Sequence, residues 1–83
     1  MKYRVIWLPI AKAQFREIWT RSKNRADVKR AAIAFEKELS NDPHNAGESR
    51  FSIFRIISDS PLFANYTVDD RTNTVYILSV RGK

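Results

Sequence analysis

Three apolar, β-branched runs follow one another in the last third of the chain, and they limit the possible folds more than any other feature. They cover residues 52–57, 62–68 and 75–80. Polar stretches rich in turn-forming residues separate them, at 58–61 and at 69–73. Three such runs joined by connections this short predict a three-stranded antiparallel meander.

One strand and one helix are predicted at the start of the chain. Residues 2–8 alternate loosely and are rich in aromatic and β-branched side chains, which is typical of a strand. Pro9 ends this strand and suits the first turn of a helix. The apolar residues after it recur at helical spacing: Ala11, Phe15, Ile18 and Trp19.

A second helix is marked more clearly. Its apolar stripe has the spacing i, i+4, i+7, i+11 and consists of Val28, Ala32, Phe35 and Leu39. Ser22 or Asn24 can cap this helix, and Asp27 suits its first turn because a carboxylate there faces the positive end of the helix dipole. Residues 40–43 stop it, and 44–49 read as a polar connector.

The element order is therefore β-α-α-β-β-β within a single domain, residues 1–83. The connection between the two predicted helices is short, which favours an antiparallel helix pair. Each helix has one apolar stripe to bury, and a sheet face can cover both. We expect an α+β fold in which the helix pair packs on one face of a four-stranded, mostly antiparallel sheet.

The positive charge of the chain is concentrated at its beginning. Residues 1–30 hold nine Lys or Arg and two Asp or Glu, which gives +7, whereas residues 31–83 hold six and seven, which gives −1. Such a field attracts polyanions or an acidic protein partner. The alternative is a solvated helix surface that charge keeps soluble.

Several classes of protein are disfavoured. The chain has no cysteine, so disulfides and thiolate metal sites are excluded, and this fits a reducing cytoplasm. No apolar run is long enough for a membrane span or a signal peptide. His44 is the single histidine and lies in the polar connector, where a solvated side chain is expected. We therefore predict no metal and no cofactor.

The chain resembles the RelE/ParE superfamily of type II toxins. The resemblance covers nearly the whole length and is most specific in residues 63–68, which are followed by a short acidic turn and by the valine-rich residues 75–81. It implies a compact cytoplasmic toxin that a cognate antitoxin neutralises. RelE-like members cleave mRNA in the ribosomal A site, and ParE-like members inhibit DNA gyrase; a fold alone does not choose between these activities.

The RelE-like activity needs cations that stabilise the charged phosphorane during attack of the RNA 2′-OH. We predict a metal-independent endoribonuclease with three catalytic candidates: Arg50, Arg55 and Arg81. Lys83 and Arg71 are predicted to contact RNA. Arg55 interrupts an apolar strand, and it either contacts phosphate or pairs with a carboxylate such as that of Asp59.

Two departures from the RelE-like pattern favour the alternatives, which are ParE-like gyrase inhibition or an inactive member of the family. Phe63 stands where RelE-like members carry an arginine, and the chain stops at Lys83 without their C-terminal Tyr or His. Tyr66 and Tyr76 are better explained as core residues. In all three alternatives we expect a basic and apolar surface to bind the antitoxin, with these residues in contact: Lys12, Arg16 and Trp19.

Overall fold

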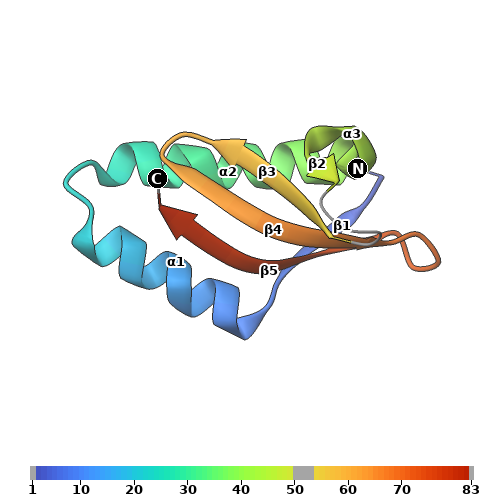
Figure 1. Cartoon of the computed structure of the whole chain (residues 1–83), viewed down its shortest axis with the longest axis horizontal. Coiled ribbons are helices and arrows are strands. Elements are labelled where there is room, and N and C mark those ends of the chain that lie inside the picture. Colours follow the sequence, from blue (N-terminus) through green and yellow to red (C-terminus); the bar gives the residue numbers. More distant parts are fainter. Residues whose placement is uncertain (1, 50–53, 83) are drawn as a thin grey trace.

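The computed structural model of the chain describes residues 2–49 and 54–82. Figure 1 shows two long helices beside one twisted sheet. The elements are β1 (Arg4–Trp7), α1 (Pro9–Arg21), α2 (Arg25–Asn41), α3 (Pro43–Ala46), β2 (Glu48–Ser49), β3 (Arg55–Asp59), β4 (Leu62–Asp69) and β5 (Thr74–Gly82). Within these residues no helix combines the length and the apolar character that crossing a membrane requires.

The strands form one sheet in the order β1-β5-β4-β3-β2. β1 pairs with β5 in parallel, and the other neighbouring strands are antiparallel. The predicted meander is therefore confirmed as β3, β4 and β5. The predicted α+β fold is confirmed with it, because β2 adds only two residues to the edge of a sheet of four main strands.

The two faces of the sheet have different surroundings. The helix face packs against the helices, and α2 passes behind β3 and β4 in Figure 1. Its buried side chains include Ile57, Leu62, Ala64, Tyr66, Ile77 and Val80. The outer face points away from the helices and carries the intervening residues, among them Ser58, Phe63, Asn65, Ser79 and Arg81.

The stripe predicted for the second helix forms the centre of the core. Val28, Phe35 and Leu39 are fully buried, and Ala32 is nearly so. Asn24 is the residue that caps α2, since its side chain accepts a hydrogen bond from the Asp27 amide at 3.2 Å. The stripe of α1 is less buried: Ala11 lies in the core, and the larger side chains of this helix pack at its margin.

The connector at 44–49 is more structured than the sequence predicted. Pro43 starts the one-turn helix α3, because its fixed φ suits a first helical position, and β2 follows. Gly47 joins them at a point of close approach. A Cβ at this position would overlap the Ile56 carbonyl oxygen and lie 2.8 Å from Tyr66 Oη, so only glycine fits there without a shift.

Candidate functional site

A groove of about 540 Å³ separates α1 from α2 beside the end of β1. Its floor is aromatic. Trp7 and Phe15 meet edge to face with ring centroids 5.6 Å apart, and Phe15 and Trp19 lie 6.3 Å apart. Aromatic side chains that pack only against one another on one side offer a large apolar area to a ligand on the other.

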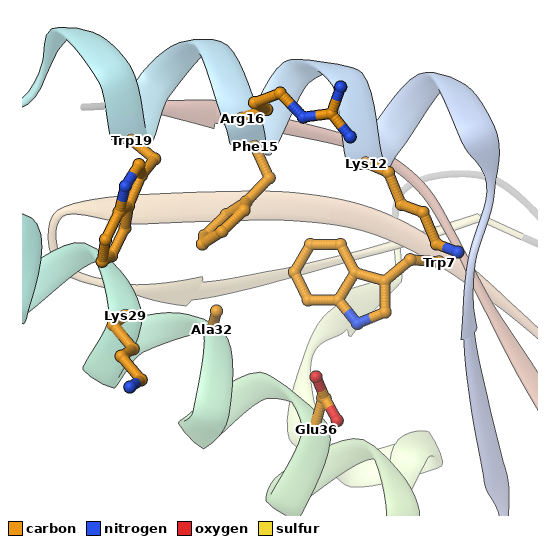
Figure 2. Close-up of a pocket in the computed structure, with 8 residues that line it drawn as sticks. All are labelled: Trp7, Lys12, Phe15, Arg16, Trp19, Lys29, Ala32 and Glu36. Atoms are coloured by element: carbon orange, nitrogen blue, oxygen red, sulfur yellow. The ribbon is translucent and has the colours of Figure 1, made fainter.

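Charged side chains surround this floor. Lys12 and Arg16 come from α1, and Lys29 and Glu36 come from α2. Figure 2 shows them around the three aromatic rings, with Ala32 providing a shallow wall on the α2 side. Three cations and one carboxylate leave the groove net positive, so it suits a ligand that is apolar and acidic. The three residues predicted to bind a partner all line this groove: Lys12, Arg16 and Trp19.

Arg25 fixes the far end of the groove. Its guanidinium lies 6.0 Å from the ring centroid of Trp19, within the range of a cation–π contact. The same side chain donates to the carbonyl oxygens of Trp19 and Thr20, at 3.1 and 3.3 Å. The last turn of α1 is therefore tied to the start of α2, and Trp19 is held in place.

Trp7 contributes a buried polar group to the floor. Its indole Nε1 is buried and has no hydrogen-bond partner among the described residues. Buried indole N–H groups usually find an acceptor. In Figure 2 this nitrogen points toward α2 on the side of Glu36.

Arg55 lies on the helix face and supports α3. It is directly opposite the buried Tyr66 in the sheet register, and its Nη1 donates to the His44 carbonyl oxygen at 2.9 Å. Tyr66 Oη donates to the Pro43 carbonyl oxygen at 2.6 Å. The carbonyls at the end of a helix need such donors, so Arg55 and Tyr66 together hold α3 against the sheet.

Arg81 lies on the outer face, opposite Phe63 in the register. Its side chain is exposed. Beside it Asn65 Nδ2 donates to Ser79 Oγ at 2.9 Å across the same two strands. Arg55 and Arg81 therefore lie on opposite faces of the sheet, and one phosphate cannot contact both side chains.

Arg71 does not join this pair. Arg71 lies in the β4–β5 turn, with its side chain 92% exposed, at the end of β5 opposite Arg81. The seven residue-to-residue steps of β5 from Thr74 to Arg81 separate the backbone of this turn from that of Arg81 by roughly 23 Å. Arg50 and Lys83 lie outside the described residues.

A cluster that the sequence analysis missed joins three distant segments. Asp70 Oδ1 accepts hydrogen bonds from Tyr3 Oη at 2.9 Å and from His44 Nε2 at 2.8 Å. The His44 bond above all, and then the Tyr3 bond, hold the pKa of Asp70 below its ordinary value. The same hydrogen bond to Asp70 raises the pKa of Tyr3. His44 was expected to be solvated; its ring is partly exposed, but it is paired.

No group of three or more His, Asp or Glu side chains that could hold a metal ion occurs within residues 2–49 and 54–82. The groove offers a ligand apolar area and cations, and Arg81 is exposed to an anion on the outer face.

No family model matches the chain, and no curated protein matches it. Solved structures do. A chain of the toxin-antitoxin complex RelBE2 from Mycobacterium tuberculosis is similar with a TM-score of 0.80 and 22% identity, over 100% of both chains. A chain of the chromosomal ParDE system from P. aeruginosa has a TM-score of 0.72 and 16% identity, over 98% of this chain and 96% of that one.

A chain of the intact RelBE toxin-antitoxin complex from E. coli is similar with a TM-score of 0.67 and 24% identity, over 98% of this chain and 95% of that one. The likeness extends over essentially the full length in all three cases, and it includes both RelE-type and ParE-type systems. The resemblance found in the sequence is thus confirmed at the level of structure: the chain has the RelE/ParE fold.

Proposed function

We propose that the chain is the toxin of a type II toxin-antitoxin pair and acts in the cytoplasm. The observation that carries this proposal is the groove between α1 and α2, which is apolar and cationic. The fold that forms it is shared with chains from solved toxin-antitoxin complexes. A partly exposed apolar surface of this kind is typical of a protein–protein interaction site.

The antitoxin segment that fits this groove is amphipathic and acidic. Apolar side chains would cover Trp7, Phe15 and Trp19, and carboxylates would meet Lys12 and Arg16. Tryptophan is among the residues most enriched at interface hot spots, while charges at the rim mainly speed association. Trp19, which Arg25 holds in place, is therefore the expected hot spot.

For the activity of the free toxin we propose cleavage of ribosome-bound mRNA, as in RelE-like toxins. Arg81 supports this, because it is an exposed cation beside hydrogen-bonding and aromatic side chains on the outer face of the sheet. Its guanidinium can hold a phosphate through two hydrogen bonds. Arg50 and Lys83 are proposed to add positive charge, and Arg55 to act through its hold on α3.

A ParE-like inhibitor of DNA gyrase is the second candidate. One observation favours it: Arg55, Arg71 and Arg81, which were predicted to serve a nuclease site, do not converge on one face. In this case the basic surface of α1 would contact the target, and no nuclease site is needed.

One culture distinguishes the two activities. The chain is induced without a partner, and protein synthesis, mRNA integrity and DNA integrity are followed together. Cleaved mRNA with early loss of translation, abolished in Arg81→Met, supports the nuclease. Intact mRNA with DNA damage, abolished in Arg16→Glu and not in Arg81→Met, supports the gyrase inhibitor. Absence of any arrest contradicts both activities.

The partner is tested separately. Where a small acidic protein is encoded beside this chain, it is co-expressed, and its affinity is measured for wild type, Trp19→Ala and the control Ile10→Ala. Ile10 is 60% exposed on α1 and does not line the groove. We expect Trp19→Ala to weaken binding at least 30-fold, which corresponds to a hot spot of about 2 kcal/mol, and Ile10→Ala to leave it unchanged. Equal effects would refute the groove as the antitoxin site.

A further inference from the structure

β5 does not keep one alternation of side chains along its length. Val75 and Ile77 are both buried on the helix face, so strict alternation would place residues 79 and 81 on that face too. Instead Val80 is buried and Arg81 is exposed. The reversal comes from a β-bulge, because the register runs from Tyr66↔Ile77 to Asn65↔Ser79 and skips Leu78.

The bulge occurs where β5 loses its neighbour on one side. β1 pairs with β5 only as far as Trp7↔Ile77, and the Leu8 amide makes the last bond, to the Ile77 carbonyl oxygen at 3.1 Å. Pro9 then begins α1. Beyond this point the backbone of β5 has no strand on the β1 side to bond with, and a half-buried amide without an acceptor is costly.

Gln14 of α1 takes the place of the missing strand. Its Oε1 accepts a hydrogen bond from the Val80 amide at 2.8 Å. This bond holds the strand two residues after Leu78, with Val80 directed toward the core and Arg81 toward the outer face. Gln14 itself lies on the side of α1 that faces β5, whereas Phe15 and Arg16 line the groove.

We propose that Gln14 is the positioning residue for Arg81: by holding the Val80 amide it fixes the bulge, and thereby the face on which Arg81 is presented. The orientation of Arg81 follows from the geometry of α1 and β5 alone. Only its consequence for growth arrest rests on the proposed function.

Two substitutions of similar length separate the hydrogen bond from packing. Gln14→Met keeps the length and the helix propensity and removes the acceptor, and Gln14→Glu keeps an acceptor oxygen. The full-length chain is examined by NMR through the exchange rate of the Val80 amide and the cross-strand backbone contact between Arg81 and Phe63, which are partners in the register. In Gln14→Met we expect about tenfold faster exchange at Val80 and loss of the Arg81–Phe63 contact. In Gln14→Glu we expect both to be retained.

The proposal is overturned if Gln14→Met keeps the Arg81–Phe63 contact, or if Gln14→Glu loses it as Gln14→Met does. The second criterion applies even where Gln14→Met fails to fold. Growth arrest gives the functional readout. If Arg81→Met relieves arrest and Gln14→Met does so to a similar extent, the positioning role is supported. Relief by Arg81→Met alone contradicts it.

If the Arg81–Phe63 contact is lost in Gln14→Met while neither variant changes the arrest, Gln14 still positions Arg81, and the proposed use of Arg81 is what fails. The two failures are therefore distinguishable.

Discussion

Arg55 and Arg81 are both arginines in the apolar meander, and the structure uses them in different ways. Arg55 lies on the helix face, half-buried, with its guanidinium on the His44 carbonyl oxygen. Arg81 lies past a bulge on the outer face and is exposed. The comparison teaches that an arginine inside an apolar strand can have a structural role, as a hydrogen-bond donor to a backbone carbonyl. The cation with a free approach is the better candidate for binding an anion.

The largest loss of stability is expected at Gly47, which lies against the Ile56 carbonyl oxygen and the Tyr66 hydroxyl. In Gly47→Ala the new Cβ would overlap the Ile56 carbonyl oxygen, and backbone must move to relieve it. We expect a loss of about 3 kcal/mol in the free energy of unfolding, measured by urea denaturation. Gly82→Ala is the matched control, since the nearest atom to its Cβ, Ile18 Cγ2, is 4.0 Å away. A similar loss in both variants would show that the close approach at Gly47 is not what limits this position.

The next effect tests the buried hydroxyl beside Arg55. Tyr66 is fully buried, and Tyr66→Phe leaves the Pro43 carbonyl oxygen without its donor at 2.6 Å. An unsatisfied buried acceptor costs about 2 kcal/mol. Tyr76→Phe, on the half-buried outer side of β5, should cost less than about 0.5 kcal/mol. If the two variants unfold at the same urea concentration, the Tyr66 hydroxyl on the helix face is no more important to stability than the Tyr76 hydroxyl on the outer face.

Much of this arrangement can be predicted from local sequence. The meander follows from β-branched runs and polar turns, and α2 follows from one stripe of Val28, Ala32, Phe35 and Leu39. Three of the residues that line the groove, Lys12, Arg16 and Trp19, were also singled out from the sequence as a basic and apolar part of the first helix. Propensity and periodicity act within one element, and the strands, the helices and their apolar stripes depend on little else. The α2 side of the groove, with Lys29 and Glu36, depends on how the two helices pack.

The rest depends on contacts between distant segments. His44 and Asp70 meet across 26 residues, and Gln14 and Val80 across 66. The bulge at Leu78 cannot be read from the alternation of β5, since the apolar residues of this strand continue through it. For this reason the sequence left open which face holds Arg55, and it grouped Arg55 with Arg81 although the sheet separates them.

The arginine pair can be compared directly through stability. Arg55→Met removes the donor to the His44 carbonyl oxygen, and we expect it to cost about 1 kcal/mol. Arg81→Met removes an exposed side chain and should change the free energy of unfolding by less than about 0.5 kcal/mol. Equal losses in urea denaturation would end the distinction between a supporting and an available arginine. A larger loss in Arg81→Met would reverse it.

The smallest effect concerns the hydrogen bond between the His44 ring and Asp70, since Arg55 binds the backbone of the same histidine. Asp70 accepts from His44 and Tyr3, which lowers its pKa in the folded state below the ordinary value near 3.8. A carboxyl whose pKa is lowered by folding stabilises the protein above the unfolded pKa and loses this contribution as the pH falls through the folded pKa. Asp70→Asn should therefore lower the melting temperature at pH 6 and have a diminishing effect below about pH 4.

Glu36→Gln, on the exposed surface of α2, controls for the loss of one negative charge. Melting temperatures are measured from pH 6 to pH 2.5 for wild type and both variants. A difference between wild type and Asp70→Asn that stays constant with pH would show that the hydrogen bonds do not depend on the carboxylate charge. Because Arg55 holds the backbone of His44 and Asp70 holds only its ring, Asp70→Asn should also cost less at pH 6 than Arg55→Met. The reverse order would mean that the ring contact, rather than the arginine, fixes α3 to the sheet.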